Sequence, residues 1–193
     1  MRTRRASTPL ALRLAVAAIL LAAPTWWLAQ RQDRVGNENR LSAIASAIAG
    51  RDVRVSCPGV RGRILSWDTV EGSVRFGADG RPADETRLRE FACSELDGLA
   101  EGRRAGALAC GSGPACADLA LAVDVLAHES FHLAGFIDEG EAECRAVRTL
   151  SWTAQQLGAT PEQGRALAAR YVETGYPRLP ERYHLPGCEL PQA

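Results

Sequence analysis

The six cysteines constrain the fold of this chain more than any other feature of its sequence. They all lie well past the N-terminus, at Cys57, Cys93, Cys110, Cys116, Cys144 and Cys188. An even number of cysteines in an oxidising compartment usually pairs, so three disulfides are expected if the chain leaves the cytoplasm. The sequence predicts one pair, Cys110 with Cys116, because the residues between them read as a turn. It leaves the other pairings open.

The first 30 residues carry the signal that decides the compartment. Three arginines stand among the first five residues, and residues 14–29 contain no charge. Such a segment enters a membrane, and the positive-inside rule puts the remainder outside the cytoplasm. Trp26 and Trp27 suit a membrane interface, and Pro24 spoils the small-residue cleavage site before it. An uncleaved anchor is therefore favoured over a cleaved signal that would release a secreted protein.

The expected organisation is a targeting segment followed by one domain. Residues 1–30 form a cytoplasmic n-region and a membrane anchor or signal sequence, 31–50 a juxtamembrane linker and helix, and 51–193 an extracytoplasmic domain. A length of 193 residues allows one core of useful size. The 23 basic and 23 acidic residues balance, without a basic stripe, so nucleic-acid binding is not expected. The oligomeric state is not indicated.

The predicted fold class is α+β, a mostly helical domain with a small N-terminal β-sheet. Alternation of β-branched and apolar residues indicates the strands, and apolar residues at helical spacing indicate the helices. The C-terminal tail is rich in proline and is expected to be irregular. Strands are predicted within 52–57 and 64–76, and helices over 41–50, from Asp84 through Leu99, over 114–133, from Asp138 onward and over 160–175.

The stretch "HESFH", residues 128–132, carries the clearest chemistry. His128 and His132 are four residues apart on a helix, so both imidazoles project from one face and can hold one ion. Glu129 lies beside the position of an activated water and suits the role of general base. The stretch resembles the active-site helix of zincin metallopeptidases. The resemblance implies Zn²⁺, catalytic Glu129 and a peptide or protein substrate; the alternative is a solvated polar helix face.

Acidic residues after this motif offer a third metal ligand. Asp138 and Glu141 have the spacing of a helix capping box, which gives both a structural role. Glu143 lies on the buried stripe of the following helix, and Glu139 lies one turn earlier on the same stripe. Buried carboxylates are costly unless they are paired or metal-bound, so this placement supports a metal nearby. The alternative is that Glu139 is solvated and that Glu143 pairs with an arginine such as Arg145.

Residues 139–143 also resemble the E-x-x-A-E pattern of the glutamate-ligand zincins, the gluzincins. The resemblance implies Glu139 as the third ligand and Glu143 as the partner that orients a metal-bound histidine. Six residues separate His132 from Glu139, which is fewer than gluzincins usually have, so the two glutamates could exchange roles.

A second resemblance competes with the first. "HESFHLAGFID" also matches the pattern of the small bacterial metzincin snapalysin, in which Asp138 would be the ligand. Metzincins carry a methionine below the metal, and Met1 is the only methionine here. The order of preference is Glu139, Glu143 and then Asp138, with Asp124 as a further candidate to orient a metal-bound histidine.

Two further expectations concern function. The segment "EGSVRF" could form the edge strand on which zincins bind substrate, and Tyr171, Tyr183 and His184 could stabilise an oxyanion. A rival function is a non-catalytic cell-surface interaction module, with a structural metal or a core held by disulfides.

Overall fold

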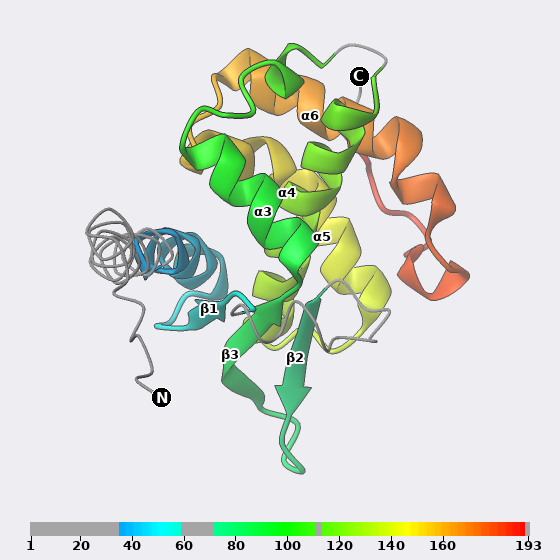
Figure 1. Cartoon of the computed structure of the whole chain (residues 1–193). Helices are drawn as coiled ribbons and strands as arrows, with labels where there is room; N and C mark the ends of the chain where they lie inside the picture. Colours follow the sequence, from blue (N-terminus) through cyan, green and yellow to red (C-terminus); the bar gives the residue numbers. More distant parts are fainter. Residues whose placement is uncertain (1–34, 59–71, 111–112, 192–193) are drawn as a thin grey trace, which may run out of the picture. The chain divides into compact units, whose positions relative to one another are not determined.

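The computed structural model describes residues 35–58, 72–110 and 113–191, most of them in a compact unit over Asn37–Ala193 (Figure 1). The predicted membrane segment and the first part of the predicted 64–76 strand region lie outside the described residues. Among the helices that the structure describes, none is both long and apolar enough to cross a membrane.

The fold is α+β, as predicted, with helices predominating over one small sheet. A helix over residues 35–49 precedes the sheet. The η elements below are single turns of 3₁₀-helix. In chain order the labelled elements are β1 (Arg54–Ser56), β2 (Gly72–Phe76), β3 (Pro82–Leu88), α3 (Glu90–Ala100), η1 (Ala107–Ala109), α4 (Pro114–Leu133), α5 (Glu139–Gln156), α6 (Pro161–Thr174), η2 (Tyr176–Arg178) and η3 (Glu181–Tyr183).

The sheet is mixed, with β3 in the centre. Strand β1 pairs with β3 in parallel and β2 pairs with it antiparallel, so Thr86 on β3 stands between Val55 and Val74. Within the described residues, β2 therefore forms one edge of the sheet. Both β2 and β3 contact α4, which brings the sheet against the helix that carries the histidines.

The predicted helix from Asp84 is wrong over its first residues. Residues up to Leu88 form β3, and α3 begins only at Glu90. Thr86 and Leu88 are buried, whereas Glu85 and Arg87 are more exposed. This alternation of buried and exposed side chains is typical of a strand. Leu88 has the same helical spacing as the apolar residues of α3, and for this reason the predicted helix began too early. In the structure this segment is a strand because it pairs with both β1 and β2.

The helix ends follow the sequence signals. Pro114 stands at the start of α4, and Gly135 turns the chain after α4 with a φ of 102°. Asp138 accepts a hydrogen bond from the backbone of Glu141 and so begins α5. Thr160 begins α6 with the predicted capping box.

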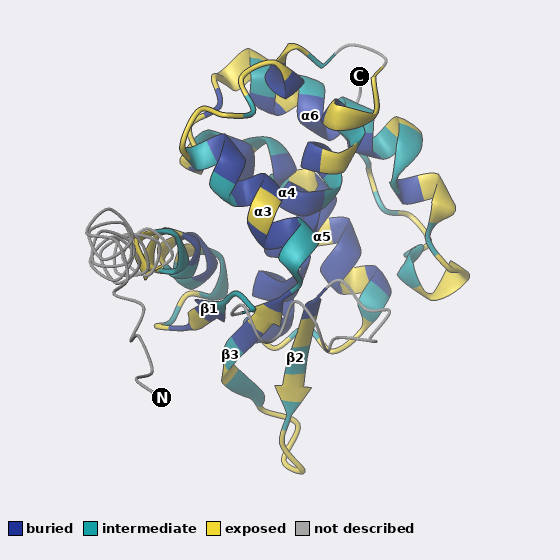
Figure 2. Ribbon diagram, in the orientation of Figure 1, coloured by how far each residue is buried: buried dark blue, intermediate teal, exposed yellow. Residues whose placement is uncertain are grey.

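Helix α4 is the centre of the core (Figure 2), where it packs against α3, α5, α6 and the sheet. Its residues are almost all buried after Cys116, and a helix that is buried on every side must normally be apolar. Five polar side chains break that rule in this helix: Asp124, His128, Glu129, Ser130 and His132. Buried polar groups are costly unless they have partners, so a cluster of this size indicates a functional role. The cluster includes the two histidines and the glutamate of the "HESFH" motif.

Three disulfides use all six cysteines. Cys110–Cys116 was predicted and is confirmed, and the structure adds Cys57–Cys93 and Cys144–Cys188. Cys144–Cys188 ties the irregular C-terminal tail to α5 across 44 positions of sequence. This cross-link keeps the tail, including η3, against the start of α5, where the backbone of Arg182 approaches Gly140.

Candidate metal centre

Three side chains from α4 and the start of α5 meet at one point. The Nε2 atoms of His128 and His132 lie 3.0 Å apart, and Oε2 of Glu139 lies 3.1 Å from the first and 3.2 Å from the second. Around a tetrahedral ion bonded at about 2.0–2.1 Å, ligand atoms lie about 3.3 Å apart. The triangle of donor atoms therefore has the size that such an ion requires, and this group could hold a metal ion.

The other ring nitrogens fix which atoms face the centre. Nδ1 of His132 lies 2.6 Å from the backbone oxygen of Phe136, and a carbonyl can only accept, so this Nδ1 carries a hydrogen. Nδ1 of His128 lies 2.9 Å from Oε2 of Glu143 and donates to that carboxylate. In neutral imidazoles both Nε2 atoms then present lone pairs. Three acceptors face one another, an arrangement that a cation satisfies and that neutral side chains do not.

Without a metal, a proton can fill this place. Burial works to lower the pKa of His128, but hydrogen bonds with Glu139 and Glu143 outweigh it and raise the pKa to about 10. The hydrogen bond with His128 is also the main reason that the pKa of Glu139 is lowered. A metal ion would displace this proton, so metal binding at the site is expected to release protons.

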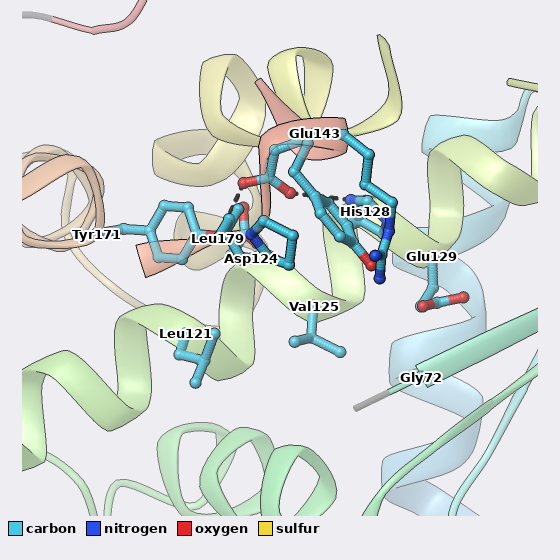
Figure 3. Close-up of a pocket in the computed structure, with 12 residues that line it drawn as sticks. Gly72, Leu121, Asp124, Val125, His128, Glu129, Glu143, Tyr171 and Leu179 are labelled. Carbon is cyan, nitrogen blue, oxygen red and sulfur yellow. Dashed lines mark hydrogen bonds and ion pairs between the residues drawn. The ribbon is translucent and has the colours of Figure 1, made fainter. Parts of the chain in front are cut away.

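Glu143 lies beneath His128 rather than in the triangle. Its side chain is 2% exposed, and its Oε1 accepts a hydrogen bond of 2.7 Å from the hydroxyl of Tyr171 on α6. Both carboxylate oxygens therefore have partners, and Figure 3 shows the two bonds as dashed lines. The alternative prediction, pairing with Arg145, does not occur, because the guanidinium of Arg145 lies over the ring of Phe136.

Glu129 is buried beside the histidines, between α4 and the sheet. Thr86 is within hydrogen-bond distance of its Oε2 at 3.4 Å. A Cβ on Gly72 would come within 2.6 Å of the Glu129 side chain, so any larger residue at the start of β2 would push the Glu129 carboxyl out of this position. Burial raises the pKa of Glu129, partly offset by the two histidines. A carboxylate that binds protons more readily suits a general base near neutral pH.

A cavity of about 300 Å³ opens beside His128 and Glu129 (Figure 3). One side is formed by α4 and the first residue of β2, and the other by the tail from Leu179 to Tyr183. The ring of Tyr183 lies 5.6 Å from that of His128. The cavity therefore gives a bound molecule access to the edge of the candidate metal centre.

The remaining predicted residues lie at different distances from the centre. Asp138 caps α5 through its side chain and does not belong to the triangle. Asp124 is buried on α4 one turn before His128 and lines the cavity, as does Tyr171. His184 lies away from the triangle, where its Nε2 is 3.1 Å from the backbone oxygen of Leu179 and stabilises the tail.

Sequence reasoning missed three contributors to the centre. The backbone oxygen of Phe136 has no side-chain signature, although Gly135 predicted the turn that delivers it. Thr86 was placed on a helix, and its position beside Glu129 follows only from the pairing of β3. Gly72 gave no signal beyond being a glycine in a strand, which often marks a close approach.

No protein-family model, no curated protein and no solved structure matches the chain significantly. The resemblance to zincins therefore rests on the motif residues alone.

Proposed function

We propose that this protein is a zinc-dependent metallopeptidase anchored at the outer face of a membrane, or secreted if its leader is cleaved. The observation that carries the proposal is the convergence of His128, His132 and Glu139, with buried Glu129 beside them and outside the triangle. Nitrogen and carboxylate ligands on a helix pair favour Zn²⁺. Catalytic zinc sites use three protein ligands and keep one position open, whereas structural sites are closed by four.

The chain's own residues supply the rest of the chemistry. Zinc held by His128, His132 and Glu139 would supply Lewis-acid chemistry and would lower the pKa of water toward neutral pH. Glu129 accepts the proton of the attacking water and passes it to the leaving amine. Glu143 and the backbone oxygen of Phe136 keep each histidine in the tautomer that leaves Nε2 free to bind a metal ion together with Glu139. Tyr183, whose ring lies 5.6 Å from that of His128, is a candidate to donate a hydrogen bond to the developing oxyanion.

A peptide substrate is supported by the sheet. Strand β2 begins at Gly72 beside Glu129 and forms one edge among the described strands, so an extended chain added there would pass the candidate base. The six paired cysteines agree with an extracytoplasmic setting.

The decisive experiment is Glu129→Gln in the full-length protein. We expect about one zinc per chain by elemental analysis in both proteins, and hydrolysis of casein or quenched peptides that falls by at least about 100-fold in the variant. The matched control is Glu162→Gln, which removes an exposed carboxylate from the start of α6 and should change neither quantity.

The rival function makes the opposite prediction. If the metal is structural in a non-catalytic interaction module, the wild type binds zinc and cleaves nothing in a broad peptide library, and Glu129→Gln changes only stability. Equal turnover of wild type and variant would remove Glu129 from the mechanism.

A further inference from the structure

The cavity beside the candidate metal centre has an acidic end. It follows α4 from Glu129 and His128 back to Asp124 and Leu121, which is about two helical turns, or roughly 11 Å. Figure 3 shows Asp124, Glu143 and Tyr171 gathered together, with Glu129 lying apart from them. A group bound at Glu129 could therefore extend a side chain along α4 toward Asp124.

Asp124 is the polar group in this cavity that lacks a full set of partners. The residue is 2% exposed, and among the described residues its Oδ1 has no hydrogen-bond partner. Burial raises the pKa of Asp124 well above its usual range, and the neighbouring Glu143 adds to the effect. Asp124 also has a hydrogen bond with Tyr171, which leaves Oδ1 as the buried atom without a partner. A buried acceptor without a partner is costly, so a cationic donor that reached Oδ1 from the cavity would be stabilised and would favour the ionised form of the carboxyl.

The walls between the two ends are apolar. Leu121 and Val125 line the cavity from α4, and Leu179 and Pro180 line it from the tail. A volume of about 300 Å³ is at the lower limit of ligand pockets, which run from about 300 to 1,000 Å³, so it suits one long side chain. Apolar walls that lead to a buried carboxyl match a flexible hydrocarbon stem that ends in an ammonium group.

We propose that this cavity selects substrates with a lysine-like side chain next to the scissile bond, and that Asp124 is the residue that determines this specificity. The inference rests on the proposed peptidase function. Arg182 also lines the cavity, but it is exposed and its guanidinium lies 4.9 Å from the ring of Tyr183, on the tail side. Because its guanidinium contacts Tyr183, Arg182 does not fill the end of the cavity that Asp124 lines.

The test uses fluorescence-quenched peptide substrates that differ at a single position. This position is moved along the peptide so that it lies on either side of the cleaved bond. Lysine, norleucine and glutamate are compared, because norleucine keeps the stem of lysine without its ammonium. We expect wild-type kcat/KM to favour lysine over norleucine by at least tenfold at one position, and Asp124→Asn to reduce this ratio to about threefold or less. Asp118→Asn, which removes an exposed carboxylate from the same helix, should keep the wild-type ratio.

A binding measurement separates this inference from the peptidase proposal. Pentylamine should bind the full-length wild type at least tenfold more tightly than pentanol, by titration calorimetry or chemical-shift changes, and Asp124→Asn should remove the difference. Equal binding of the two probes, or equal cleavage of the lysine and norleucine peptides, would overturn the inference. Amine-selective binding without hydrolysis of any peptide would contradict the peptidase proposal and leave the cavity assignment in place.

Discussion

Two regions of this molecule bury a glutamate, and the cost of burying its charge is offset in different ways. On α3, Glu95 is 7% exposed and pairs with the guanidinium of Arg104, which reaches solvent. On α5, Glu143 is buried beneath His128, and Glu139 faces two imidazole nitrogens. In the first region a carboxylate meets a cationic donor of the chain. In the second region Glu143 accepts from His128 and Tyr171, whereas Glu139 faces two Nε2 atoms that are themselves acceptors when the imidazoles are neutral.

This difference shows how a buried carboxylate at a candidate metal site can be told from one in an ordinary ion pair. Burial raises the pKa of Glu95 as it does that of Glu129, so burial alone does not distinguish them. Glu95 even has one oxygen without a partner among the described residues, but Arg104 already balances its charge. The candidate metal centre differs because no arginine of the chain faces His128, His132 and Glu139 among the described contacts, so that a bound proton or a metal ion has to supply the positive charge.

Metal removal should have the largest effect on stability, and this effect should depend on the two histidines and not on Glu95. With zinc at 100 times its dissociation constant, binding stabilises the folded chain by about 2.7 kcal/mol, or roughly 5–10 °C in Tm for a domain of this size. A chelator should therefore lower the Tm of the wild type by that amount in a thermal scan. Glu95→Gln should show the same chelator shift, and His128→Ala with His132→Ala should show none; a chelator shift in the double variant would place the metal elsewhere.

Loss of the group beneath His128 should have the next largest effect. Glu143→Leu removes the acceptor that orients Nδ1, and such partners typically contribute 10–100-fold to metal affinity, about 1.4–2.7 kcal/mol. Competition with a zinc-binding dye measures this change. Tyr171→Phe keeps the carboxylate and loses only one hydrogen bond to it, so its affinity should fall by less. Unchanged affinity in Glu143→Leu would mean that packing alone orients His128.

The smallest effect is expected at the ordinary ion pair. Glu95→Gln should lower the free energy of unfolding by less than about 1 kcal/mol, because the Arg104 side chain is 38% exposed and water screens the pair. Denaturant titration measures this loss. Zinc content should stay at the wild-type value, and a loss of zinc in this variant would show that the two regions are coupled.

Much of the candidate metal centre could be predicted because its residues lie close together in the sequence. The i, i+4 spacing of the histidines, the turn at Gly135 and the cap at Asp138 are short-range rules, and together they carry Glu139 back to the histidines. The burial stripe also separated Glu143 from the capping residues. Metal binding and hydrolysis themselves stay predictions.

The features that sequence reasoning missed are long-range. Thr86 reaches Glu129 through a strand pairing that local apolar spacing misassigned to a helix. Cys144–Cys188 could not be chosen from the cysteine positions, since many pairings fit them. The second wall of the cavity is formed by the tail, which this disulfide joins to α5.

The turn at Gly135 has a consequence for how the protein matures. Glu139 lies 11 positions after His128 and Glu143 lies 15 after it, so the convergent cluster consists of a single helical hairpin. Loops this short close on a timescale of nanoseconds to microseconds and at little entropic cost. The hairpin that carries the candidate metal centre can therefore assemble before the distant tail arrives. The order of synthesis would provide this cluster of His128, His132 and Glu139 first and the second wall of the neighbouring cavity afterwards.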